Sequence, residues 1–266
     1  MSNGSSRTIL QRSHTPNGAQ IAVLTIDHPP LNLFDQAMME SLRTQVAGIS
    51  ADCPRALVIR AEGRMTSAGV DVNLFSGLDS HQAAAMWQGL LDDLIQPIEQ
   101  LPCPVIFAAN GLTLTAAFEI ALASDLILAT PDAQFGLIER TVGLTPSMGG
   151  PQRLAERAGS GRARELIMTG ATYDAATMAA WGVVNTVCDN IDEAATTLAH
   201  RLADGPTLAH AATKRLIAAW RTGSVALADE LTPAVSGSLF ETNDLKSAVA
   251  NFLVDGPRHG THYTAT

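Results

Sequence analysis

The stretch VIFAANGLTLTAAFEIALASDLILA, residues 105–129, decides the fold predicted for this chain. It begins and ends with short apolar runs, Val105–Ala109 and Leu126–Ala129, whose length is typical of buried strands. Asn110-Gly111 ends the first run with a turn signal, and a mostly apolar helical segment follows it. Strands that alternate with helices in this way indicate an α/β fold in which helices pack on a sheet.

The same stretch contains an apolar run, Leu112 to Ala129, that is about as long as a membrane span, which needs roughly 20 apolar residues. Glu119 and Asp125 lie inside this run. Carboxylates are rarely buried without a partner or a purpose, so their presence favours a buried helix followed by a strand. We therefore expect no membrane span, and we expect the charge at these positions to have a function.

The segments before this stretch continue the α/β pattern. Turn signals and apolar spacing predict two strands joined around Asn17-Gly18, a helix capped by Asp35, a buried strand, and a helix that Ser80 caps and Pro97 breaks. In chain order these elements are Thr8–Ser13, Gln20–Asp27, Gln36–Ser50, Ala56–Ala61 and 80–101.

The C-terminal part of the sequence differs from the rest. From about Ala194 onward strand signals fade and amphipathic helices dominate, with Gly205-Pro206 as a break. We therefore expect an α/β core in residues 1–195, which carries the functional site, and a helical region in residues 196–266. The helical region has more apolar residues than a lone appendage should expose, so we expect it to pack against a partner.

Composition and charge narrow the partners and the compartment. The chain of 266 residues is 46% hydrophobic and 16% charged, and its net charge of -9 argues against nucleic acid. Cys53, Cys103 and Cys188 are scattered, which favours a reducing compartment. The segment from Met1 to Arg7 lacks an apolar run, so nothing marks export. We expect a cytoplasmic protein.

Common cofactor and metal motifs do not occur in the sequence. It contains no H-E-x-x-H, no G-x-G-x-x-G, no G-x-x-x-x-G-K-[ST] and no G-x-S-x-G. We therefore expect neither a metal site nor a separate cofactor.

Three short segments carry the chemical signal, and each is weak alone. They are SAGVD at 67–71, ANGLTLTAAFE at 109–119 and QFGLIE at 134–139. In this order and spacing they resemble the enoyl-CoA hydratase/isomerase superfamily, the crotonases, and the likeness continues through 146–154 and 182–185. The resemblance implies an α/β fold, a crotonase-like spiral of ββα units, followed by a helical C-terminal trimerisation region.

The resemblance implies that two backbone N–H groups, those of Val70 and Ala116, hold the oxygen of an acyl-CoA thioester. Helix starts have unpaired N–H groups and a positive dipole end, which suits a developing oxyanion. An ordinary turn is the alternative for the 67–71 segment, with Asp71 bonding its own backbone.

Glu119 and Glu139 are the candidate proton carriers. Glu119 lies among apolar residues, where burial would raise its pKa, although one face of a helix could also carry it to the surface. Glu139 alone could be a solvated partner of Arg140 or Arg153. By resemblance to hydratases the two glutamates flank one water, which Glu119 deprotonates for attack at Cβ while Glu139 delivers a proton to Cα.

These residues leave several activities open. The leading prediction is an enoyl-CoA hydratase that adds water across the 2,3 double bond of a trans-2-enoyl-CoA. A Δ3-Δ2 enoyl-CoA isomerase that uses Glu139 alone is close behind, and a decarboxylase is weaker. A non-catalytic acyl-CoA-binding relative is an alternative of a different class.

The sequence departs from the family pattern beside the acidic residue. Hydratases usually carry three glycines where this chain has Thr115-Ala116-Ala117, and a Phe is common where it has Thr66. An alanine N–H can still donate, but the added methyl groups narrow the approach to the backbone. The acyl groups that typical members accept therefore do not transfer directly to this chain.

The resemblance also implies contacts to the rest of the substrate. Arg64 matches a basic residue that binds coenzyme A, and Ala68 and Asp71 are expected at the substrate in the same loop. Phe252 matches a Phe that a neighbouring subunit's C-terminal helix contributes, although Asp255 stands where a Lys is usual. A homotrimer, or a hexamer built as a dimer of trimers, is the implied assembly.

Overall fold

The computed structural model describes residues 7–256 and 261–266. Its strands are β1 Arg7–His14, β2 Gln20–Asp27, β3 Ala56–Ala61, β4 Val105–Ala109, β5 Leu112–Leu114, β6 Leu126–Ala129, β7 Gln134–Gly136, β8 Tyr173–Asp174 and β9 Thr186–Val187. Its helices are α1 Gln36–Ala51, α2 Ser80–Leu90, α3 Gln96–Gln100, α4 Ala116–Ala123, α5 Gly150–Ala158, α6 Ser160–Thr169, α7 Ala175–Ala180, α8 Ile191–Ala203, α9 Thr207–Thr222, α10 Val225–Ser238 and α11 Asn243–Asp255. Short helical turns are η1 Val72–Phe75, η2 Leu91–Ile95, η3 Glu139–Val142 and η4 Leu239–Glu241.

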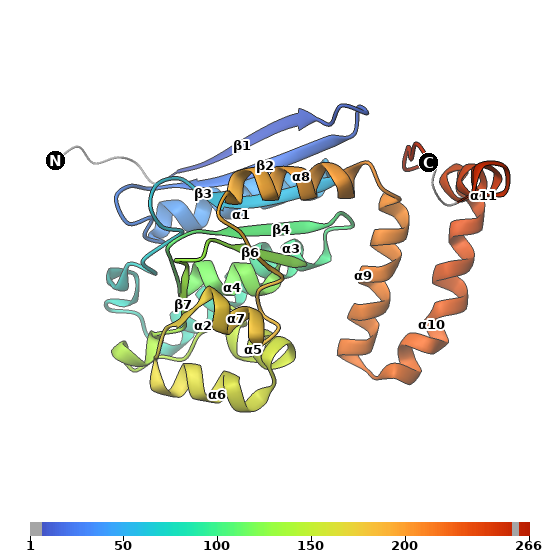
Figure 1. Ribbon diagram of the computed structural model, residues 1–266. Coiled ribbons are helices and arrows are strands. Elements are labelled where there is room, and N and C mark those ends of the chain that lie inside the picture. Colours follow the sequence, from blue (N-terminus) through green and yellow to red (C-terminus); the bar gives the residue numbers. More distant parts are fainter. Residues whose placement is uncertain (1–6, 257–260) are drawn as a thin grey trace.

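Two sheets organise the core (Figure 1). The larger has the strand order β1-β2-β3-β4-β6-β9, in which β1 and β2 form an antiparallel hairpin and the later neighbours are parallel. The smaller has the order β5-β7-β8, with β5 and β7 parallel. Parallel neighbours need long crossover connections, and the helices supply them. The predicted α/β class is confirmed.

Helices cover both faces of the larger sheet. Alternate residues of its strands point to opposite faces, and on one face Ile21, Val58 and Ile106 pack against α8. The residues of α8 that meet this face are alanines spaced by four positions, which lets the helix lie close to the strands: Ala195, Ala199 and Ala203. The other face packs against α1, α3 and α4 in one large apolar cluster.

Most predicted elements are present, but the cap of α2 was assigned wrongly. Asp79, not Ser80, is the N-cap: its side chain accepts from Gln82 N, and the Gln82 side chain accepts from Asp79 N. This reciprocal capping box satisfies two free N–H groups at once, which a serine one residue later would not do. The helix predicted for 80–101, with a break at Pro97, is three consecutive pieces, and the irregularity is the wider turn η2 just before Pro97.

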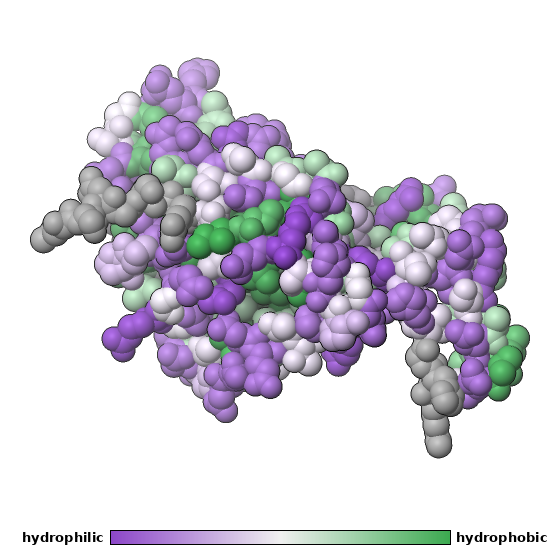
Figure 2. All heavy atoms as spheres, turned by 90° about the horizontal axis from the view of Figure 1, so that it is seen from above, coloured by the Kyte–Doolittle hydropathy of each residue, from purple (hydrophilic) through white to green (hydrophobic). Residues whose placement is uncertain are grey.

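The C-terminal helices α9, α10 and α11 form an arm that projects from the core (Figure 1). The division predicted at residues 195 and 196 lies within α8, which packs on the sheet, and the arm follows the Gly205-Pro206 break. Large apolar side chains are exposed on the arm: Ile217, Trp220, Val225, Leu227, Phe240, Val249, Phe252, Leu253 and Val254. Figure 2 shows apolar surface on this part of the molecule. Among the described residues no helix has the length and apolar character needed to cross a bilayer.

Gly111→Ala tests the turn that joins β4 to β5. Gly111 has a φ of +52°, and a Cβ there would collide with the Arg64 carbonyl oxygen. We expect the free energy of unfolding, measured by urea denaturation, to fall by about 2–4 kcal/mol. Gly48→Ala is the matched control, because its Cβ would meet no atom within 4 Å in α1 and should stabilise the protein by about 0.5–1 kcal/mol. Equal effects of the two changes would contradict this explanation.

Candidate active site

Strand β5 brings the three motif segments together. On one edge, Ser67 N donates to Leu112 O at 2.8 Å and Leu114 N donates to Ser67 O at 3.2 Å. On the other edge β5 pairs with β7, and Thr115 N donates to Gly136 O at 2.9 Å. The loop at 67–71, the start of α4 and the segment that leads to Glu139 are therefore neighbours.

The loop at 67–71 runs beside the extended segment at Phe34, and the N–H of Val70 points away from that segment. Phe34 N donates to Gly69 O, and Asp71 N donates to Phe34 O, so the residues on either side of Val70 make the bonds of a parallel bridge. Alternation along an extended chain turns the Val70 N–H the other way. Within the part of the chain that the structure describes, this N–H donates to no protein atom.

The N–H of Ala116 also donates to no atom of the described residues, because Ala116 is the first residue of α4 and a helix start has no intrahelical acceptor for it. The preceding residue, Thr115, lies against Gly69: a Cβ built on Gly69 would be 3.0 Å from Thr115 Oγ1. Val70 follows Gly69 in the chain, and Ala116 follows Thr115. The two predicted oxyanion amides thus come from backbone segments in direct contact.

Glu119 is buried at the wall of this site, with 2% of its surface exposed. Its Oε1 accepts hydrogen bonds from Met148 N and Gly150 N, both at 2.8 Å. Burial, and after it the nearby charge of Glu139, raise the pKa of Glu119 to about 8, although the two N–H donors act in the opposite direction. Gly150 is needed for this contact, since a Cβ there would lie 3.0 Å from Oε1.

Glu139 begins η3 directly after β7 and is partly buried. Burial raises its pKa to about 7. Its Oε2 is shielded from solvent and has no hydrogen-bond partner among the described residues. Two neighbouring carboxyl groups that both titrate near neutral pH form the arrangement expected of an acid and a base acting on one substrate.

The remaining predicted site residues have different surroundings. Arg64 is exposed in the loop before Val70, and Ala68 is half-buried, with its N–H donating to Leu31 O. Asp71 accepts from both N and Nδ2 of Asn73, so it caps η1. Phe252 lies on the arm with 57% of its surface exposed, and Figure 1 places α11 well apart from α4. Within this chain, therefore, Phe252 does not join the site.

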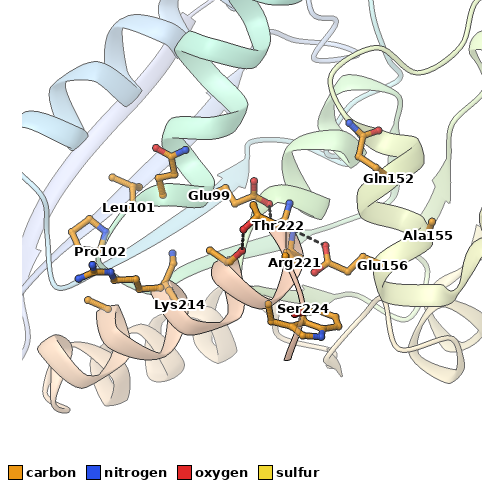
Figure 3. Close-up of a pocket in the computed structure, with 16 residues that line it drawn as sticks. Glu99, Leu101, Pro102, Gln152, Ala155, Glu156, Lys214, Arg221, Thr222 and Ser224 are labelled. Carbon is orange, nitrogen blue, oxygen red and sulfur yellow. Dashed lines mark hydrogen bonds and ion pairs between the residues drawn. The ribbon is translucent and has the colours of Figure 1, made fainter. Parts of the chain in front are cut away.

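Two cavities lie near these elements. One of about 350 Å³ lies between α1, η1 and α2, and Val70 is part of its mostly apolar wall, together with Met39, Leu74, Phe75, Met86 and Trp87. A larger cleft of about 1080 Å³ separates α9 from α3 and α5. Figure 3 shows Arg221 in that cleft between Glu99 and Glu156, and none of the predicted site residues lines it. Size alone would therefore select a cavity other than the one beside Val70.

Comparisons with known proteins identify the family of the chain. Residues 17–258 match the enoyl-CoA hydratase/isomerase family, and the chain belongs to that family. A probable enoyl-CoA hydratase of Bacillus subtilis (strain 168) is 30% identical over 237 residues, which cover 88% of this chain and 92% of that protein. A hexahydro-1H-indene-carboxyl-CoA hydrolase of Mycobacterium tuberculosis (strain H37Rv) is 33% identical over 195 residues, 72% of this chain and 77% of that protein.

The fold agrees as well. The crystal structure of an enoyl-CoA hydratase from Bacillus anthracis superposes with a TM-score of 0.88 and covers 98% of this chain and 100% of its own, at 24% identity. The predicted crotonase fold with a helical C-terminal region is therefore confirmed. Among the described residues no group of three or more potential metal ligands comes together.

Sequence reasoning missed two features of the site. The amides of Met148 and Gly150 hold Glu119. The sequence places both residues in the segment 146–154, which resembles the family, but gives that segment no function. The signal was Gly149-Gly150 ahead of Pro151, because glycines before a helix start allow close approach to its N–H groups. The second feature is the side chain of Thr115, whose surroundings only the packing reveals.

The pH dependence of stability tests the burial of Glu119. Folding raises the pKa of this carboxyl from 4.5 to about 8, so between these pH values the native state keeps the proton that the unfolded state releases. The free energy of unfolding therefore falls as the pH rises from about 4.5 to about 8. Glu119→Gln keeps an oxygen for the two amides but cannot ionise. We expect the variant and the wild type to melt similarly at pH 5, and the variant to melt at the higher temperature at pH 9.

Each unit of raised pKa corresponds to about 1.4 kcal/mol, so the difference should be easy to measure by thermal denaturation across the pH range. A melting difference that stays constant between pH 5 and pH 9 would contradict the raised pKa of buried Glu119.

Proposed function

We propose that the chain is an enoyl-CoA hydratase that adds water to a trans-2-enoyl-CoA. The observation that carries the proposal is the grouping of two free backbone amides, Val70 and Ala116, with two carboxyl groups whose pKa values lie near neutrality, Glu119 and Glu139. Membership of the enoyl-CoA hydratase/isomerase family supports the reaction class.

In the proposed mechanism the thioester oxygen accepts hydrogen bonds from the N–H groups of Val70 and Ala116. This withdraws electrons from the conjugated double bond and makes Cβ electrophilic. In the reactive form of the pair Glu119 is ionised and Glu139 is protonated, a form that is populated near neutral pH because the two pKa values, about 8 and about 7, lie close together. Glu119 then takes a proton from water as the water oxygen bonds to Cβ, and Glu139 gives its proton to Cα as the enolate collapses. The product is a 3-hydroxyacyl-CoA with the OH of the water at Cβ and the proton of Glu139 at Cα. Return of the proton from Glu119 to Glu139, through solvent or directly, restores the starting pair, so the net change is the addition of one water.

The environment of each carboxyl group suits its proposed role. Two amides orient Glu119 through Oε1, which fixes the carboxylate while it handles water. Glu139 has a buried oxygen that no described residue contacts by a hydrogen bond, so it is available to a proton at a substrate carbon. General acid–base catalysis works best when the pKa of the group lies near the working pH, as it does for both.

The same Glu139 oxygen supports one alternative, a Δ3-Δ2 isomerase in which Glu139 alone moves a proton between carbons. The Mycobacterium tuberculosis relative is named a hydrolase, so the family context does not select a single reaction. Hydration adds one water to the substrate mass, whereas isomerisation leaves the mass unchanged. A non-catalytic acyl-CoA-binding protein would bind the thioester and change nothing.

Other contacts of the substrate are proposed from position. The apolar cavity of about 350 Å³ borders Val70, so it can receive the acyl chain of a thioester held there. Arg64 is exposed at the start of the same loop and offers a positive charge to the phosphates of coenzyme A. Its charge is local, because the chain as a whole carries -9.

We also propose that the arm mediates assembly into a trimer or hexamer, and that Phe252 of one copy contacts the coenzyme A bound to another. The exposed apolar side chains of the arm support this, since a soluble monomer rarely exposes so many on one element. We place the enzyme in the cytoplasm, where its three free thiols would stay reduced.

Replacing Glu139 tests the proposed reaction. Glu139→Gln cannot deliver a proton to Cα, so we expect the rate of crotonyl-CoA hydration to fall by about 100-fold or more. Glu193→Gln, at an exposed position of α8, is the matched control and should hydrate at the wild-type rate. Loss of conjugation absorbance gives the rate, and product mass identifies the reaction. Unchanged hydration by Glu139→Gln would refute the role given to that residue.

Assembly is tested on α11. Leu253 and Val254 are exposed there, and replacing both by glutamate puts two charges where apolar contact is proposed. Light scattering should give the wild type the mass of a trimer or hexamer of the 27.9-kDa chain and the double variant a smaller mass. Asn251→Glu adds a charge to the same helix without removing apolar surface and should assemble normally. A monomeric wild type would contradict the proposed assembly.

A further inference from the structure

Thr115 has a backbone conformation that its residue type rarely adopts. Its φ is 49° and its ψ is -122°. Glycine tolerates positive φ freely, and asparagine tolerates it well, as at Asn32, whereas a β-branched side chain is strained there. Strain of this kind persists only where the surrounding structure imposes it, and it gathers at functional sites.

Helix capping does not explain the threonine. Thr115 is the N-cap of α4, yet its side chain accepts no hydrogen bond from the helix. Thr242, in contrast, caps α11 in the ordinary way by accepting from Leu245 N. The Thr115 side chain therefore does not perform the function for which threonine is usually favoured at a helix start.

The hydroxyl of Thr115 is also left without a partner. The residue is 6% exposed, and Oγ1 is buried with no hydrogen bond to any described residue. A buried hydroxyl without a partner is unfavourable, and native structures contain few of them. A strained backbone and a buried hydroxyl without a partner thus occur together at one residue. A hydrogen bond to a bound ligand atom would satisfy the hydroxyl.

The position of the hydroxyl indicates which ligand atom that is. Thr115 Oγ1 faces Gly69, where even a Cβ would come within 3.0 Å, and Gly69 is the residue before Val70. Thr115 is itself the residue before Ala116. The hydroxyl therefore lies between the backbone segments that supply the two free amides.

We infer that the Thr115 hydroxyl is a third hydrogen-bond donor to the carbonyl oxygen of the acyl thioester, beside the N–H groups of Val70 and Ala116. This inference rests on the proposed function. A thioester oxygen that gains negative charge as an enolate forms can accept a further hydrogen bond, and such a bond is stronger in the transition state than in the bound substrate. Where other members of the family have glycines, the side chains of Thr115, Ala116 and Ala117 narrow the access of the substrate to the backbone. The extra donor would offset that narrower access.

Three substitutions at Thr115 separate donation from packing. Thr115→Val keeps the shape and the strain but removes the hydroxyl, so crotonyl-CoA hydration should slow by about 100-fold. Thr115→Ser restores a hydroxyl and should recover most of the rate. Thr115→Gly removes strain and hydroxyl together, so it should melt at an equal or higher temperature and still hydrate slowly. Slow hydration by the valine variant but not by the glycine variant would overturn the inference.

Thr113→Val is the matched control. Thr113 is a buried threonine two residues upstream, and its Oγ1 also has no partner among the described residues. It lies in β5 opposite Ser67 and Phe135, not between the two free amides. We expect this variant to hydrate at close to the wild-type rate. A loss equal to that of Thr115→Val would mean that any buried hydroxyl near the site matters, and the inference would fall.

A binding measurement separates failure of this inference from failure of the proposed function. Butyryl-CoA carries the carbonyl oxygen, and S-butyl-CoA is the thioether without it. By calorimetry the wild type should prefer butyryl-CoA, and Thr115→Val should lose about 10-fold of that preference without weaker binding of the thioether. A full preference in Thr115→Val overturns the Thr115 inference alone. No preference in the wild type overturns the proposed oxyanion site and this inference with it.

Discussion

The hydrogen bonds on both edges of β5 are the constraint on which the site depends. One edge fixes the loop that ends at Val70, and the other fixes the segment that leads to Glu139, while β5 itself runs directly into α4. Two amides and two carboxyl groups from three distant parts of the sequence therefore have their relative positions set by main-chain bonds. Side-chain changes around them can alter the substrate without dismantling the frame.

The chemistry of the site opposes the stability of the fold. Glu119 lies in an apolar environment where its charged form is disfavoured, and the amides of Met148 and Gly150 recover only part of that loss. The balance leaves its pKa close to neutral instead of far above it. Glu139 reaches a similar value through burial alone. The protein thus keeps two carboxyl groups that titrate near neutral pH, at the expense of native-state stability.

Much of the fold could be predicted because it depends on local signals. Apolar runs gave the buried strands, and the turn at Asn17-Gly18 gave the first hairpin. The predicted start of α2 is one residue too late. A capping box needs two side chains that each accept from the other residue's N–H, and Asp79 and Gln82 form that pair. The amides that hold Glu119 and the isolation of the Thr115 hydroxyl depend on contacts between distant segments, which one sequence does not reveal.

The central claim is that backbone amides polarise a thioester oxygen at this site. The most direct measurement is the infrared difference spectrum of enzyme-bound butyryl-CoA with and without a carbon-13 label at the carbonyl. The label isolates the stretch of that one bond. The account predicts a carbonyl frequency clearly lower than that of butyryl-CoA free in water, because hydrogen bonding weakens the double bond. A bound frequency equal to or above the free value would contradict it.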